Sequence, residues 1–373
     1  MHFLSTTSLL FAAALPLASA GKKPASTCKG LDSLAKEAGL LYFGSATDSP
    51  GQRERAGLDA AYAQYDEIMW KSGEFGQTTP TNGQKWLFTE PTQGDFNFTE
   101  GEIVASKAQK SGMYLRCHAL AWHSQLAPWV ETAEWTPATL RAALTNHVTK
   151  VAEHWKGRCY AWDVVNEALD EDGTYRESVF YQVLGDEYIK IAFRAAAKAD
   201  PKAKLYYNDY NLESPSAKTE GVKKIIKLLR DDGIRIDGVG LQAHLVAENH
   251  PTLDQHIDAI KGFANLGVEV ALTELDIRLQ TPATPTNLAL QKEAYKNVVG
   301  ACVQVKGCIG ITLWDFYDPF SWVPYVFQQE GAALLWFEDF TKHSAYAGVV
   351  EALTNTSSHG GKKANRSGNV WIV

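Results

Sequence analysis

Two apolar segments of the chain end in glutamates that could do acid–base chemistry. WDVVNEAL (residues 162–169) has the composition of a buried strand and then reaches Asn166 and Glu167, and VEVALTEL (residues 268–275) reaches Glu274 in the same way. A carboxylate at the edge of a core is unfavourable unless it is paired or used. Two facing carboxylates suit glycoside hydrolysis, in which one donates a proton to the leaving oxygen while the other stabilises or attacks the oxocarbenium-like centre.

Other apolar segments also end in polar or aromatic side chains that could bind a sugar. They are Asn208, Asp209, Gln242, His244, Asp276, His118, Trp122 and Trp314. Taken singly, each is more often a buried polar group that its neighbours satisfy. Together they would bring two glutamates, two histidines and several tryptophans to one rim, where aromatic faces stack on sugar rings and amides or imidazoles bind hydroxyls. This combination favours a glycosidase, which requires neither a metal nor a cofactor.

The order of the segments predicts the scaffold that positions these residues. Eight short apolar runs begin at Leu40, Glu74, Met113, Ala161, Lys204, Gly238, Val268 and Ile309. Helical patterns such as residues 136–155 and 219–233 separate them, which indicates a parallel sheet covered by helices. About eight such units in roughly 320 residues fit a single-domain α/β fold, the (β/α)8 TIM barrel, whose active sites lie at the C-terminal ends of the strands. No glycine-rich phosphate loop follows a strand, which disfavours nucleotide binding.

The two ends of the chain predict a secreted, extracellular protein. Residues 1–20 combine an apolar middle, an Ala-Ser-Ala cleavage pattern and no acidic residue, which predicts a secretory signal peptide. We expect a leader over residues 21–30, the catalytic domain over residues 31–354 and a flexible polar tail over residues 355–373. The formal net charge of −7 argues against nucleic acid or an anionic membrane as a partner.

Five cysteines suit an oxidising compartment but are too few for a disulfide scaffold. Cys302 and Cys308 enclose a short loop and are the expected bridge. Cys117 and Cys159 fall within apolar runs, which favours free thiols that act as small core residues, and Cys28 has no obvious partner. No cysteine or histidine set has the spacing of metal ligands. The candidate glycosylation sites are Asn97, Asn355 and Asn365.

Eight motifs follow one another along the chain in an order that one enzyme family shares. They are YFGSATD, TTPTNGQKW, HALAWHSQLAPWV, WDVVNEAL, YYNDYN, GLQAHL, LTELDIR and WDFYDPFSW. From about Leu31 to Leu353 the chain resembles glycoside hydrolase family 10, the (β/α)8 endo-β-1,4-xylanases, in particular its secreted fungal members. We expect a monomer without a cofactor. The resemblance implies hydrolysis of internal β-1,4-xylosidic bonds in xylan and xylo-oligosaccharides, with retention and a covalent glycosyl-enzyme intermediate.

The resemblance also assigns roles to residues of the matching motifs. Glu167 is expected to be the acid/base and Glu274 the nucleophile. Substrate-binding roles are implied for Asn82, Lys85, His118, Trp122, Gln125, Asn166, Gln242, His244, Trp314 and Trp322. Asp163, Asn208 and Asp276 would support these groups. Asn166 would hold the 2-hydroxyl of the sugar next to the scissile bond, and the two late tryptophans would form stacking walls.

Four positions depart from the pattern of the family. Thr81 stands where a glutamate is common, which implies weaker binding of the second glycone sugar. Cys117 and Asp315 stand where glycines are common, and Phe337 stands where many relatives have an aspartate. These departures leave open a second hypothesis, in which the same chemistry acts on another β-glycoside, such as a glycosylated plant defence compound. A third, a carbohydrate-binding or inhibitory protein on an inactive barrel, conflicts with the intact set of Glu167, Glu274, Asn166 and His244.

Overall fold

The computed structural model describes residues 29–48 and 59–355. The expected signal peptide, most of the leader, Cys28, Asn365 and all but the first residue of the tail lie outside the described residues. Asn97 and Asn355 are both exposed at the surface. No helix among the described residues is long and apolar enough to span a membrane.

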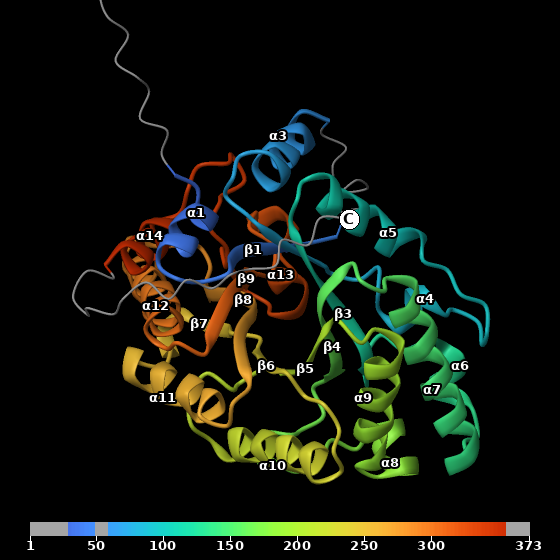
Figure 1. The fold of residues 1–373 in the computed structure, drawn as a ribbon. Helices are drawn as coiled ribbons and strands as arrows, with labels where there is room; N and C mark the ends of the chain where they lie inside the picture. Colours follow the sequence, from blue (N-terminus) through green and yellow to red (C-terminus); the bar gives the residue numbers. More distant parts are fainter. Residues whose placement is uncertain (1–28, 49–58, 356–373) are drawn as a thin grey trace, which may run out of the picture.

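Parallel strands close into a barrel at the centre of the molecule (Figure 1). In the described residues these strands are β1 (Tyr42–Thr47), β2 (Gln77–Pro80), β3 (Tyr114–Trp122), β4 (Cys159–Asn166), β5 (Lys204–Asp209), β6 (Gly238–Leu241), β8 (Glu269–Gln280) and β9 (Cys308–Leu313). Each pairs with its neighbours in parallel, and β9 pairs with both β8 and β1, which closes the ring. Each of the eight apolar runs overlaps one of these strands. The predicted (β/α)8 barrel is therefore confirmed.

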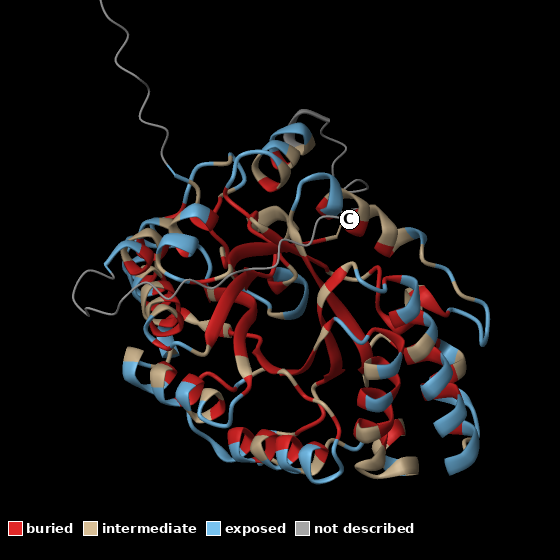
Figure 2. Cartoon of the chain, in the orientation of Figure 1, coloured by how far each residue is buried: buried red, intermediate tan, exposed pale blue. Residues whose placement is uncertain are grey.

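Helices connect successive strands and cover the outside of the barrel. The longer ones are α3 (Asp59–Trp70), α5 (Thr99–Lys110), α7 (Pro137–His154), α9 (Glu187–Ala199), α10 (Ala217–Asp231), α11 (Leu253–Ala264), α12 (Pro285–Gln304) and α14 (Ser344–Thr354). Figure 2 shows buried strands inside a ring of helices whose outward faces are exposed. Capping side chains help fix where α7, α10, α11 and α12 begin. Thr136, for example, accepts from the backbone N–H of Thr139 at the start of α7, with Pro137 in its first turn.

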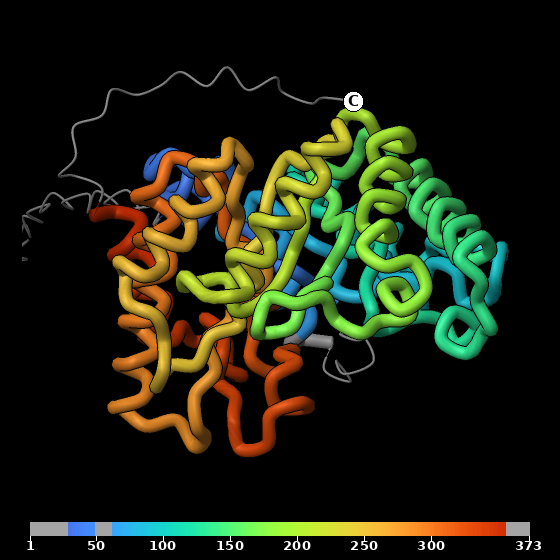
Figure 3. Tube along the Cα trace, turned by 90° about the horizontal axis from the view of Figure 1, so that it is seen from below, coloured from blue at the N-terminus to red at the C-terminus, as the bar shows by residue number. Residues whose placement is uncertain are grey.

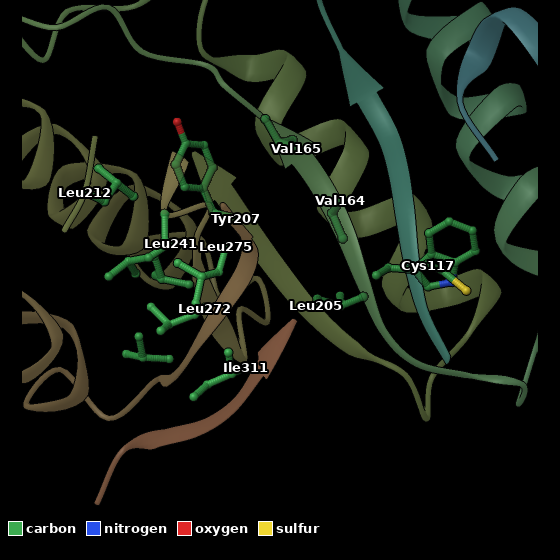
Figure 4. Packing of buried hydrophobic residues seen from close by; sticks show 14 of the residues in the cluster. Cys117, Val164, Val165, Leu205, Tyr207, Leu212, Leu241, Leu272, Leu275 and Ile311 are labelled. Atoms are coloured by element: carbon green, nitrogen blue, oxygen red, sulfur yellow. The ribbon is translucent and has the colours of Figure 1, made fainter. Parts of the chain in front are cut away.

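The interior of the barrel is packed with side chains rather than open. A Cβ added to Gly238 would meet the ring of Tyr206 at 2.3 Å, and one added to Gly310 would meet the ring of Tyr42 at 2.5 Å. Glycine is therefore required at both positions, where the ring of an interior tyrosine lies against a strand. Between strands and helices lies the main apolar core, part of which is seen in Figure 4. This closed base leaves the opposite, C-terminal end of the barrel as the place for a site.

The chain after β6 departs from the single strand predicted for it. Ala243 adopts a left-handed φ of 61°, so the run GVGLQAHL bends after Leu241 and resumes as β7 (His244–Val246), which pairs with β8. The buried carboxylate of Glu213 holds this bend by accepting from the backbone N–H of Ala243 at 2.7 Å. Seen from below, the orange-to-red part of the trace, which includes the end of β8, extends past the helices on one side (Figure 3). The bend and this extension raise the wall of the site.

Two disulfides are present, and one of them corrects the sequence analysis. Cys302 and Cys308 are bonded, as predicted. Cys117 and Cys159 are also bonded to each other, so the prediction of two free thiols is wrong. Their Cα atoms lie 5.8 Å apart because β3 and β4 are adjacent strands. This bond joins the two strands that carry His118 and Glu167 toward the C-terminal end of the barrel.

Candidate active site

A cleft of about 990 Å³ opens at the C-terminal end of the barrel strands. All of the residues predicted to be catalytic or substrate-binding line it: Asn82, Lys85, His118, Trp122, Gln125, Asn166, Glu167, Gln242, His244, Glu274, Trp314 and Trp322. The three supporting residues, Asp163, Asn208 and Asp276, are buried beneath it. The structure thus brings together the predicted side chains from the strands β2 to β9 and the loops that follow them.

Glu167 lies at a sharp turn directly after β4. Its φ of 55° is left-handed, which is uncommon for a residue with a side chain and turns the carboxyl into the cleft. The backbone N–H of Glu167 donates to the Asn208 carbonyl at 2.9 Å, and Arg176 Nε donates to the Glu167 carbonyl at 3.2 Å. The carboxylate Oε1 accepts from Gln242 Nε2 at 2.9 Å and from Asn166 Nδ2 at 3.2 Å. This carboxyl is therefore anchored but still faces the open cleft.

Glu274 is buried, with 4% of its surface exposed. Oε1 accepts from Asn208 Nδ2 at 2.7 Å, and Oε2 lies 3.3 Å from His244 Nε2. Burial alone would raise the pKa of Glu274, but hydrogen bonds from His244 and Asn208 and the charges of His244 and His118 outweigh it and hold the pKa below its ordinary value. Glu274 is therefore an ionised carboxylate in a nearly dry position.

His244 is the cation that keeps this carboxylate charged. Its Nδ1 lies 3.0 Å from Asp276 Oδ2, but off the line of the Nδ1–H bond, so this contact is an ion pair rather than a well-aligned hydrogen bond. Burial disfavours the charged imidazole, yet Asp276 and Glu274 raise the pKa of His244 to about 10. Trp322 Nε1 donates to the same Asp276 oxygen at 2.7 Å. Asp276 thereby orients both the imidazole and one of the tryptophan walls.

A second imidazole approaches Glu274 from the opposite side of the barrel. His118 Nδ1 lies 3.1 Å from Asp163 Oδ2 and 4.0 Å from Glu274 Oε1. Arg116 Nη2 donates to the other oxygen of Asp163 at 2.6 Å inside the barrel. Gln84 accepts from the backbone N–H of His118 at 3.1 Å. Arg116 and Gln84 are therefore supports that the sequence analysis did not name.

Polar side chains form the next part of the cleft floor. Lys85 Nζ donates to Gln125 Oε1 at 2.5 Å and to Asn82 Oδ1 at 3.2 Å, and it lies 4.8 Å from the centre of the Trp122 ring. Burial lowers the pKa of Lys85 to about 8, although the carboxylates of Glu274 and Glu167 oppose this shift. These groups offer donors and acceptors for sugar hydroxyls beside an aromatic face.

Further residues of the cleft were not predicted as site residues. Among them are the polar residues Asp48, Glu171, Tyr210, Asn211, Glu213, Ser214, Ser216 and Arg278. Asp48 directly follows β1, so the rule that selects polar residues at strand ends would have found it if the run had been extended by one residue. Within the described part of the chain, no group of three or more His, Cys, Asp or Glu side chains could hold a metal ion.

The cleft holds one buried carboxylate and one accessible carboxyl between tryptophan walls, at the C-terminal end of a (β/α)8 barrel. This is the arrangement of a glycoside hydrolase that uses two carboxyl groups. The family model of glycosyl hydrolase family 10 matches residues 30–352. The chain belongs to this family.

Similar proteins agree with this assignment. Endo-1,4-beta-xylanase A of Humicola insolens is 72% identical over 360 residues, which cover 95% of this chain and 95% of that protein. Endo-1,4-beta-xylanase D of Talaromyces funiculosus is 49% identical over 327 residues, which cover 88% and 78% of the two chains. The solved structure of a Penicillium canescens endo-1,4-beta-xylanase is 40% identical, with a TM-score of 0.83, and the match covers 87% of this chain and 97% of that one. A family 10 xylanase from Bispora sp. MEY-1, solved with xylobiose, has a TM-score of 0.82 at 41% identity, covering 87% and 99%.

Proposed function

We propose that this chain is an endo-1,4-β-xylanase that hydrolyses internal bonds of xylan with retention of configuration. The observation that carries the proposal is the asymmetry of the two carboxyl groups. Glu274 is buried and held ionised by His244, whereas the Glu167 carboxyl faces the open cleft and is bonded, among the described residues, only to amides. One group is suited to attack as a nucleophile and the other to exchange protons with the leaving group.

The reaction takes two displacement steps. Glu274 attacks the anomeric carbon and forms a covalent ester, while the bond from that carbon to the leaving oxygen breaks and the oxygen takes the proton of Glu167. Glu167, now ionised, removes a proton from a water molecule whose oxygen attacks the same carbon and releases Glu274 as a carboxylate. Two inversions at one carbon give net retention. Asn166, whose Nδ2 donates to Glu167 and whose Oδ1 shares the Asn208 donor with Glu274, is placed to bind the 2-hydroxyl of the reacting sugar.

The relatives' substrate and the sequence motifs support xylan as the polymer. We further propose that the enzyme is secreted as a monomer, with the signal peptide, leader, catalytic domain and tail bounded as predicted. The two disulfides suit an oxidising compartment, and the exposed Asn97 and Asn355 suit glycosylation.

The test measures the products released from xylan by the wild-type enzyme and the activities of Glu274→Ala and Glu167→Ala. The wild-type enzyme should release a ladder of xylo-oligosaccharides from unsubstituted xylan. Glu274→Ala should abolish turnover, and azide should rescue it with inversion because the anion occupies the vacated space. Glu167→Ala should spare dinitrophenyl glycosides, whose leaving group needs no proton, far better than xylan. Near wild-type xylan hydrolysis by both variants would reject the assignment. Activity on an aryl β-glycoside with none on xylan would favour the second hypothesis, another β-glycoside.

A further inference from the structure

The cleft continues past the catalytic pair into a second cavity of about 430 Å³. Thr81, Asn82, Trp314 and Trp322 line both spaces, so the two are continuous. Neither catalytic glutamate lines the second cavity. A sugar that extends the substrate beyond the tryptophan walls would therefore enter it.

This second cavity lies on the glycone side of the cleft. A general acid must reach the leaving oxygen, so the aglycone end is the one beside Glu167. Arg176, which donates to the Glu167 carbonyl at 3.2 Å, also donates to Tyr210 Oη at 2.8 Å, and Tyr210 and Asn211 line the cleft there. The cavity lined by Asp48 includes none of these residues, so it receives the sugars that stay attached to the nucleophile side.

Asp48 brings a carboxylate into this glycone cavity. It follows β1, and the register of β1 with β2 places it beside Thr81, whose backbone N–H donates to the Thr47 carbonyl at 3.0 Å. Asp48 Oδ2 accepts a hydrogen bond from Asn82 Nδ2. Oδ1 has no hydrogen-bond partner among the described residues. One carboxylate oxygen is therefore available to a ligand.

Asp48 also determines how the Asn82 amide is turned. Because Nδ2 donates to Asp48, Oδ1 must face the other way, where it accepts from Lys85 Nζ at 3.2 Å and from Gln125 Nε2 at 3.0 Å. A side chain without an acceptor at position 48 would no longer fix this orientation, whereas an asparagine oxygen could still accept from Asn82. Asp48 therefore helps to position Lys85 and Gln125 on the cleft floor, because it orients the Asn82 amide that both of them contact.

We propose that Asp48 is a substrate-binding and specificity-determining residue for the second glycone sugar. Its Oδ1 accepts a hydrogen bond from a hydroxyl of that sugar, and its Oδ2 holds Asn82 in place. Thr81 offers a single hydroxyl where the family commonly has a carboxylate, and Asp48 supplies that charge from the neighbouring strand. A carboxylate at this point favours a neutral sugar over one bearing an acidic substituent. The inference rests on the proposed xylanase function.

The experiment uses Asp48→Asn, which keeps the shape of the side chain and removes its charge. The value of kcat/KM is measured on a dinitrophenyl β-xylobioside, which fills both glycone positions, and on the dinitrophenyl β-xyloside, which fills only the first. Loss of a hydrogen bond to a charged group should lower kcat/KM on the xylobioside by roughly tenfold to a hundredfold. On the xyloside the change should stay within about twofold, because the second position is empty. Asp258→Asn, on the exposed face of α11, is the matched control and should change neither value.

A double-mutant cycle with Thr81→Glu separates direct binding from a general effect. The new carboxylate should raise kcat/KM on the xylobioside more in the Asp48→Asn enzyme than in the wild type, where it would lie beside an existing charge. Equal gains in both backgrounds, equal losses on both substrates, or no loss on the xylobioside would each overturn the proposal. If the wild type cleaved neither xylan nor the xylobioside, the proposed function would fail instead. Circular dichroism melting of each variant verifies that the comparison is between folded enzymes.

Discussion

Replacing His244 with glutamine should shift the pH profile of the enzyme toward higher pH. In the wild type, His244 Nε2 lies 3.3 Å from Glu274 Oε2, and the pKa of His244, about 10, keeps the imidazole charged over the working range. The charged imidazole holds the pKa of Glu274 below its ordinary value. Glutamine can still donate a hydrogen bond but carries no charge. The nucleophile should therefore become easier to protonate.

The size of the shift follows from the value of a charged hydrogen bond. Such bonds contribute roughly 1.5–3 kcal/mol, and one pKa unit corresponds to about 1.4 kcal/mol. The acidic limb of kcat/KM should thus move upward by about one to two pH units. A dinitrophenyl β-xylobioside isolates this limb, since its leaving group does not need the proton of Glu167.

The matched control is His154→Gln, which removes a surface histidine bonded to Glu102 outside the cleft and should leave the profile unchanged. An acidic limb that stays within about 0.3 units of the wild type in the His244 variant would refute the idea that this imidazole keeps the nucleophile ionised. A downward shift would refute it as well, because loss of a cation can only favour the protonated carboxyl.

Three further outcomes are expected. Proton NMR of early xylan products should show the β-anomer, and early α-anomer would contradict the covalent route. Removing the bond between Cys117 and Cys159, which are 42 residues apart, should lower the free energy of unfolding by about 4 kcal/mol, against about 2 kcal/mol for Cys302 and Cys308, which are 6 apart. Urea unfolding measures both, and a larger loss at the shorter loop would contradict the chain-entropy argument. The raised pKa of His244 stabilises the fold fully below about pH 6.5, and this contribution is lost as pH rises toward about 10. Wild-type melting temperature should accordingly fall more between pH 7 and 10 than that of His244→Gln.

The sequence predicted the barrel and the meeting of Glu167 and Glu274 in one cleft for the same physical reason. Parallel strands buried on both faces read as continuous apolar runs, and their C-terminal ends must meet at one end of the barrel. Polar residues at those ends, such as Glu167 and Glu274, are therefore brought together wherever the strands pair. Asp48 satisfies the same rule at the end of β1.

Features that depend on strand register could not be predicted in this way. The bond between Cys117 and Cys159 requires β3 and β4 to be neighbours with Leu115 opposite Cys159. The sequences of the two strands do not determine this register. Arg116 points into the barrel, where it meets Asp163 from the adjacent strand. An arginine in an apolar run does not reveal which carboxylate, if any, lies across from it. The bend at Ala243 was missed because its support, Glu213, lies thirty residues earlier in the chain.

The two carboxyl groups are tied together by amides rather than placed independently. Asn166 Oδ1 accepts from Asn208 Nδ2 at 2.8 Å and from Gln242 Nε2 at 3.2 Å. The same Asn208 nitrogen donates to Glu274 at 2.7 Å, and the same Gln242 nitrogen donates to Glu167 at 2.9 Å. Asn166 therefore sets the position of both donors, and through them the positions of both carboxylates. Asn166 Nδ2 also donates to Glu167 Oε1 at 3.2 Å. A sugar hydroxyl that accepts a hydrogen bond from this Nδ2 would weaken its bond to Glu167, so substrate binding is coupled to proton transfer by Glu167.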